Sequence, residues 1–158
     1  PEQCKGLSKT DWIDLQEADY IPRLRPNLFR IEKDDAASNG LTRRMPNTHT
    51  IWACHSYPLG DYDVADGSRW QVFFRVRCDA TTDTGTAMTL GIYDDKEHRS
   101  VASRQIPVET IRGSAYQLID LGIHTLGTDT YVWAAPVVRP PNEVEAVYVD
   151  RVFLKRVP

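Results

Sequence analysis

The clearest pattern along the chain is an alternation of apolar and polar residues with a period of two. Between positions 69 and 78, five apolar side chains would share one face of an extended segment and three polar ones the other: Trp70, Val72, Phe74, Val76 and Cys78 against Gln71, Arg75 and Arg77. This period is typical of a half-buried antiparallel strand. Residues 86–93 repeat it, with Met88, Leu90 and Ile92 on the apolar face. We therefore expect Trp70 in the core.

Further segments rich in β-branched and aromatic residues are also predicted as strands: 51–57, 101–108, 116–121, 130–135 and 145–155. Clusters of Gly, Pro, Asn and Asp separate them, as turns require. Long helical periodicity is absent, and only 107–113 is expected to form a helical turn. Together these features predict an all-β fold, an antiparallel two-sheet β-sandwich with a jelly-roll-like course.

The length and charge of the chain narrow its class. Its 158 residues suit one domain; we assign 13–158 to the sandwich and 1–12 to a possible linker remnant, although Trp12 could pack down. The start at Pro1 leads us to expect a piece of something longer. A net charge of -3 gives no basic field, which disfavours nucleic acid and anionic membranes as partners. No apolar run approaches the roughly 20 residues that span a bilayer.

The sequence contains no recognisable catalytic signature. A nucleophile elbow, a zinc signature, a phosphate loop and a Rossmann glycine pattern are all missing, so we predict no catalytic residues. The cysteines, Cys4, Cys54 and Cys78, lack the close pairing of zinc or redox sites. Cys54 and Cys78 could form a disulfide or remain buried thiols. A small jelly-roll lyase or hydrolase stays open as a further class, which a cleft with convergent Tyr, His and Arg would favour.

Three carboxylates stand in unusual surroundings. Asp150 lies inside the apolar run 145–156, and Glu17 and Asp19 lie between Leu15 and Tyr20. A buried carboxylate costs several kcal/mol unless it has a partner. If the two terminal segments lie side by side, the three form an oxygen cluster of the kind that suits Ca²⁺. The alternative is that Asp150 pairs with Arg151 or an arginine of a neighbouring strand, and that the other two are ordinary surface acids.

Short motifs give the chain a resemblance to a known group. The segment Glu17-Ala18-Asp19, the segment Val149-Asp150-Arg151-Val152 and the turn 35–40 are similar to motifs of β-sandwich carbohydrate-binding modules, in the group around families six and thirty-five. The resemblance implies a non-catalytic accessory domain that targets a linked enzyme to a polysaccharide. It also implies a structural calcium, held by Glu17, Asp19 and Asp150, a catalytic domain on the same parent chain, and an extracellular or periplasmic location.

Aromatic side chains are the candidates for sugar binding, because the apolar C–H face of a pyranose ring stacks on Trp or Tyr. Tyr131 and Trp133 share one face of a predicted strand and could form an exposed platform or a packed pair. The resemblance points to the loop aromatics and to one amide of the last long loop. The predicted carbohydrate-binding residues are Trp52, Tyr57, Tyr62, Trp133 and Asn142. The alternative function is a structural sandwich that packs against a domain or protein and binds no glycan.

Overall fold

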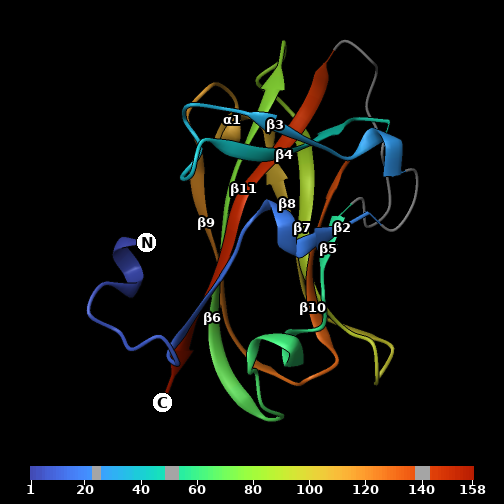
Figure 1. Cartoon of the computed structure of the whole chain (residues 1–158). Coiled ribbons are helices and arrows are strands. Elements are labelled where there is room, and N and C mark those ends of the chain that lie inside the picture. The colour runs from blue at the N-terminus through green and yellow to red at the C-terminus, as the bar shows by residue number, and fades with distance from the viewer. Residues whose placement is uncertain (23–25, 49–53, 138–142) are drawn as a thin grey trace.

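The chain folds into two antiparallel sheets that enclose one core (Figure 1). The computed structural model describes residues 1–22, 26–48, 54–137 and 143–158. Within these ranges, sheet A consists of β1 (Trp12–Leu15), β3 (Arg30–Lys33), β4 (Leu41–Pro46), β6 (Ser68–Ala80), β9 (Gln117–Leu126) and β11 (Val144–Val157). Sheet B consists of β2 (Tyr20–Ile21), β5 (Cys54–Ser56), β7 (Thr86–Asp94), β8 (Arg99–Pro107) and β10 (Thr130–Pro136). The predicted all-β sandwich is confirmed.

Sheet A is built around the paired long strands β6 and β11. Its main order is β3-β4-β11-β6-β9, and β1 adds to the same edge of β11 as β4, farther along the strand. Sheet B has the order β2-β5-β10-β7-β8. Because the chain moves repeatedly between the sheets, strands distant in sequence become neighbours. The helical segments are short: α1 (Val108–Ile111), where a helical turn was predicted, and 3₁₀ turns at Glu2–Cys4, Glu17–Asp19, Pro26–Leu28 and Leu59–Tyr62.

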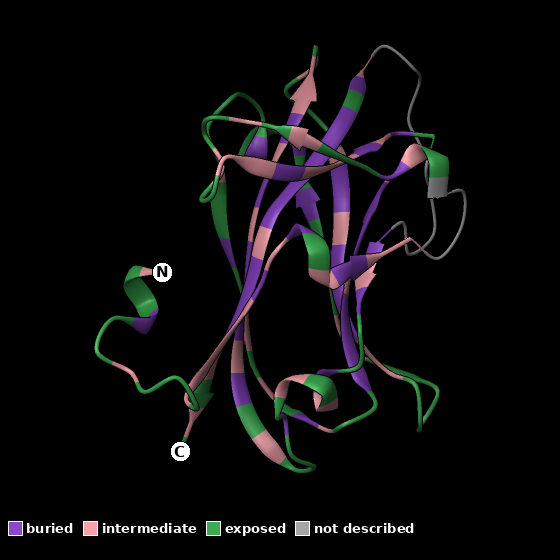
Figure 2. Cartoon of the chain, in the orientation of Figure 1, coloured by how far each residue is buried: buried purple, intermediate pink, exposed green. Residues whose placement is uncertain are grey.

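The core contains the side chains that the alternation of the sequence assigned to it. Trp70 is 2% exposed, and the inward residues of β7, among them Leu90 and Ile92, are fully buried. Figure 2 shows the resulting stripes of buried residues along the central strands. At about 25 cal/mol per Å² of apolar surface removed from water, burial of these side chains is the main stabilising contribution to the fold.

A β-bulge in β11 shapes the junction of the terminal segments. Val149 pairs with Val76 of β6 and Arg151 with Arg75, which leaves Asp150 as the extra residue. At the same point β11 exchanges one neighbour for another, since its pairing with β4 ends at Val149 and its pairing with β1 begins at Val152. The bulge allows Val149 and Val152 to face the core although two polar residues separate them.

The N-terminal segment lies against sheet A beside the C-terminal strand (Figure 1). Trp12, placed in the predicted linker remnant, is the first residue of β1 and pairs with Lys155. Cys4 is buried in a small cluster with Phe73 and Phe153. The sandwich therefore starts at Trp12, and residues before it also contribute packing.

All three cysteines are buried free thiols, which decides the question that the sequence left open for Cys54 and Cys78. Burial raises the pKa of Cys54 to about 12 and that of Cys78 to about 11. Within the described ranges, no helix is long and apolar enough to cross a membrane.

Candidate functional site

The outer face of sheet B carries a continuous row of residues that spans all five strands. Strand register places the row in the order Ile21, His55, Trp133, Gly91 and Ser103, one residue from each strand. Directly opposed residues of antiparallel strands lie on the same side of a sheet. In the neighbouring strand positions, Val132, Leu90 and Cys54 belong to the core. The row therefore points away from the core, and we call this surface the aromatic face.

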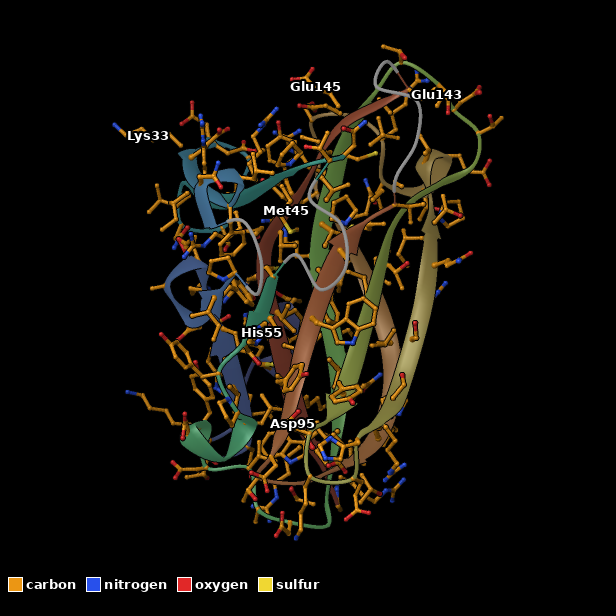
Figure 3. The ribbon with its side chains drawn as sticks, turned by 90° about the vertical axis from the view of Figure 1, so that its right-hand side faces the viewer. Lys33, Met45, His55, Asp95, Glu143 and Glu145 are labelled. Carbon is orange, nitrogen blue, oxygen red and sulfur yellow. The ribbon has the colours of Figure 1, made fainter. Side chains whose placement is uncertain are left out.

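A second row supplies further rings. Tyr131 of β10 lies opposite Tyr93 of β7, and their ring centroids are 5.5 Å apart. The ring of Tyr131 is also 5.1 Å from the imidazole of His55. Both separations are within the range of favourable contacts between aromatic rings. Figure 3 looks onto this face, with His55 at mid-height and Asp95 toward its lower end. The rings of His55, Tyr131 and Tyr93, from three neighbouring strands, thus form one cluster.

Gly91 determines how Trp133 lies on this surface. A Cβ atom added to Gly91 would be 2.3 Å from Cε2 of the indole and 2.5 Å from its Nε1, far inside any real contact. The indole therefore occupies the space that a side chain at position 91 would fill. Because a side chain there would rise from the sheet, the ring must extend across the backbone of β7. Trp133 stays half-buried in this position.

The polar groups of the aromatic face lie mainly along β8, at one edge of the sheet. Ser103 and Gln105 are exposed, and Gln105 lies opposite Thr89 in a third row. The imidazole Nδ1 of His55 is 2.9 Å from the carbonyl oxygen of Ser56, which fixes the orientation of the ring. The aromatic face thus combines rings in its middle with hydrogen-bonding groups at its margin, and apolar side chains with a few polar groups are typical of ligand sites.

The predicted sugar-binding residues have different positions. Trp133 lies in the aromatic face beside Tyr131, which is only 6% exposed. Tyr57 follows directly after β5 and is 43% exposed. Tyr62 lies in the 3₁₀ turn Leu59–Tyr62 and donates a hydrogen bond of 3.1 Å to Asp19. Burial and the nearby carboxylate raise the pKa of this phenol. Trp52 and Asn142 lie outside the described residues.

Sequence reasoning missed His55, Tyr93 and Gly91 as members of this surface. His55 belongs to no catalytic or metal-binding motif of the sequence, and Gly91 and Tyr93 lie within the predicted strand 86–93. The signal that could have found them is the pairing of β7 with β10. That register joins segments distant in the sequence, and no local pattern encodes it.

The carboxylate of Asp150 has protein partners. It is fully buried, and its Oδ1 accepts hydrogen bonds from the backbone N–H of Ser38 at 2.8 Å and from the Ser38 hydroxyl at 2.9 Å. Its Oδ2 forms a salt bridge with Arg75 of β6. The predicted alternative, an ion pair with an arginine of a neighbouring strand, is therefore present.

Glu17 and Asp19 are bonded elsewhere. Glu17 is 4% exposed, and its two carboxylate oxygens accept hydrogen bonds from Nδ2 of Asn39 at 2.6 and 3.1 Å. Asp19 accepts from the backbone N–H of Gln16 at 2.7 Å, in addition to Tyr62. In the part of the chain that the structure describes, no group of three His, Cys, Asp or Glu side chains could hold a metal ion. The residues do not fit the calcium cluster that the sequence predicted.

The outer face of sheet A carries a network of ion pairs around Arg77. Arg77 donates to Asp34 at 2.9 and 3.0 Å and to Asp79 at 2.6 Å. Its guanidinium carbon lies 3.7 Å from the ring centroid of Tyr148. The Tyr116 hydroxyl donates to Asp34 at 2.8 Å. These four side chains are therefore engaged with one another or with Arg77.

Comparisons with known proteins agree with the fold. No protein-family model matches the chain, and no curated protein matches its sequence. Among solved structures, the xylan-binding CBM22-1 domain of Paenibacillus barcinonensis Xyn10C is similar, with a TM-score of 0.64 at 9% identity over 92% of this chain and 93% of that one. A family 35 carbohydrate-binding module from Clostridium thermocellum has a TM-score of 0.58 at 9% identity, over 90% of this chain and 98% of the other. The chain has the β-sandwich fold of these carbohydrate-binding modules.

Another similar structure is that of a chain much longer than this one. It contains the CBM22-1 and GH10 modules of the Clostridium thermocellum xylanase 10B, complexed with xylohexaose. The TM-score is 0.56 at 12% identity, and the match covers 94% of this chain but only 26% of the xylanase chain. The chain therefore corresponds in size to a module, and its fold occurs beside a catalytic module in that enzyme.

Proposed function

We propose that this chain is a non-catalytic carbohydrate-binding module that holds a polysaccharide on the aromatic face of sheet B. The observation that carries the proposal is the indole of Trp133 lying across Gly91, with Tyr131, Tyr93 and His55 beside it. Sugar rings present apolar C–H faces, and an indole that lies flat over a sheet offers a matching surface. Because the indole is already held in place, little conformational entropy is lost when a ligand binds. The exposed Ser103 and Gln105 would bond hydroxyl groups at the margin.

The composition of this face favours an uncharged ligand. Among the described residues of the three rows, none is Asp, Glu, Lys or Arg. A uronic acid or a sulfated sugar would be bound more favourably where a basic side chain could pair with it. Successive strands are about 4.8 Å apart, so the row across five strands is about 19 Å long. A length of this size suits several consecutive sugar units rather than one monosaccharide.

The role of such a module would be to keep a linked catalytic domain close to its polysaccharide. The similar module of xylanase 10B stands beside a GH10 module, which supports this arrangement. Substrates too large to enter a cell are degraded outside the cytoplasm, so we expect an extracellular or periplasmic location. Binding and catalysis on one chain raise the effective concentration of the enzyme at its substrate.

The proposal is tested by affinity gel electrophoresis and a glycan array with the purified chain. We expect retardation by at least one neutral polysaccharide and no release of reducing sugar or unsaturated product from it. Time-dependent product formation would place the protein among the enzymes. Failure to bind any glycan by a folded protein would favour the structural alternative, in which the same sandwich packs against a domain or a partner protein.

A further inference from the structure

Asp150 requires a positive counter-ion because of where it lies. It is the extra residue of the bulge in β11, and its side chain is fully buried. Next to it, the pairing of β11 with β4 ends and its pairing with β1 begins. A buried carboxylate without a partner is strongly destabilising. In the modules that the sequence resembles, calcium is the expected cation at this junction. The residues present here supply a different one.

Arg75 reaches the junction from the neighbouring strand. Its Nη1 forms the salt bridge with Oδ2 of Asp150, and its Nη2 donates to the carbonyl oxygen of Ala36 at 3.0 Å. One guanidinium therefore satisfies a carboxylate oxygen and a backbone carbonyl, the two oxygen types that a calcium ion takes as ligands. The Arg75 side chain keeps 29% of its surface exposed whereas Asp150 keeps none, so Arg75 is the solvent-side partner of the pair.

The remaining oxygen of Asp150 is also occupied. Ser38 donates both its backbone N–H and its hydroxyl to Oδ1, at 2.8 and 2.9 Å. Ser38 and Ala36 belong to the turn between β3 and β4, so the ion pair and these bonds attach that turn to sheet A. Three donors thus occupy most of the acceptor sites of this carboxylate, and the guanidinium of Arg75 balances its charge.

Nearby carboxylates have internal partners as well. Asp14 accepts from Arg151 in a bidentate pair, with Nε at 2.9 Å. The carboxylate of Glu17 accepts a hydrogen bond from the amide of Asn39. The backbone carbonyl oxygen of Glu17 accepts a second one from the guanidinium of Arg43, at 2.7 Å. The oxygen groups of this junction are thus bonded to groups of the protein itself, from β4, β6 and β11 and from the turn between β3 and β4.

We propose that Arg75 is a built-in counter-ion that replaces calcium at the junction of the terminal segments, so that this module folds without a metal. The proposal does not depend on glycan binding, since it concerns the opposite sheet. It assigns Arg75 a structural role that its position on the polar side of β6 does not reveal. A guanidinium carried by the chain cannot be removed by a chelator.

The test is thermal unfolding of the native chain and of Arg75→Met, each in calcium chloride and in EGTA. We expect the native protein to melt at the same temperature in both solutions. Loss of the counter-ion should lower the Tm of Arg75→Met by about 10 °C. Arg112→Met is the matched control, because Arg112 is exposed, and it should melt like the native chain.

A double variant separates charge from packing. Arg75→Met/Asp150→Asn lacks the buried charge as well as its partner, so we expect its Tm to lie between those of Arg75→Met and the native chain. A higher Tm of the native chain in calcium than in EGTA would overturn the proposal, as would an Arg75→Met variant as stable as the native protein. If Arg75→Met fails to fold, the native comparison and the double variant still decide.

Discussion

The two outer faces of the sandwich have opposite chemistry. On sheet A, Arg77 joins Asp34, Asp79 and Tyr148 in one network, and Arg75 neutralises Asp150 nearby. On sheet B, rings lie against rings, and Trp133 extends over a glycine. Both faces contain tyrosines, but those of sheet A donate to carboxylates whereas Tyr131 and Tyr93 contact other rings.

The difference indicates a division of roles between the sheets. Ion pairs that are partly buried and geometrically matched hold segments of the chain together, and they lose much of their value when one partner is removed. An aromatic surface contributes less to cohesion and offers stacking area to a ligand. We therefore expect substitutions on sheet A to change stability and substitutions on sheet B to change binding.

The largest effect is expected from Arg77→Ala. The Arg77 side chain is 13% exposed, and its removal would leave Asp34, at 14%, without its cation. We expect a loss of about 3 kcal/mol in the free energy of unfolding, measured by urea denaturation. Glycan affinity of the folded fraction should not change. An Arg77→Ala protein that is stable but no longer binds would break the division between the faces.

A smaller effect is expected from Gly91→Ala on the other sheet. The added methyl group would collide with the indole of Trp133, which must move off the backbone of β7. We expect glycan affinity to fall about tenfold, or about 1.4 kcal/mol, with a decrease of the tryptophan fluorescence change on binding. Thr125→Ala, which shortens an exposed side chain of β9 in the other sheet, is the control. Unchanged affinity in Gly91→Ala would remove Trp133 from the binding surface.

The pH dependence of stability should also differ between the faces. Burial alone would raise the pKa of Asp34, but hydrogen bonds from Tyr116, the Ala36 N–H and Arg77 outweigh it, and the pKa is lowered. The contribution of ionised Asp34 to the free energy of unfolding is therefore present above the unfolded pKa, about 3.9, and is lost as the pH falls through the folded pKa. Burial and the hydrogen bond to Asp34 raise the pKa of Tyr116. The contribution of the protonated Tyr116 to the stability of the fold is therefore lost only above about pH 10, the unfolded pKa of a tyrosine.

We expect Asp34→Asn to flatten the acid limb of the curve of stability against pH, and Tyr116→Phe to flatten the alkaline limb. Both are measured by urea unfolding at a series of pH values. Gly91→Ala should leave the shape of the curve as it is in the native protein. An acid limb that is equally steep in Asp34→Asn would show that other carboxylates dominate it.

Much of the fold could be predicted because its central strands have simple patterns. β6 and β7 place an apolar residue at every second position, and these inward residues are all buried, although Phe73 of β6 is also buried, on the opposite side. β3 and β4 were not predicted, since charged residues at positions 30, 32, 33, 43 and 44 hide their alternation. In β4 the buried residues are Thr42 and Met45, a spacing of three that no period of two contains.

The site was less predictable than the fold. Trp133 could be named because an aromatic residue on a strand is a local feature, but Gly91 and His55 join it only through strand pairing. The carboxylates were noticed correctly as groups that need partners. Their partners, Arg75 and Asn39, come from segments far away in the sequence, and the bulge that places Asp150 has no signature of its own.

The central claim is that a glycan binds on the aromatic face of sheet B, and isothermal titration of one polysaccharide against Trp133→Ala and Tyr116→Phe tests it most directly. Circular dichroism must first show both variants folded. We predict that Trp133→Ala loses at least about 2 kcal/mol, roughly thirtyfold in affinity, while Tyr116→Phe binds like the native chain. Full binding by Trp133→Ala would contradict the claim. A loss of binding by Tyr116→Phe beside it would place the ligand on sheet A.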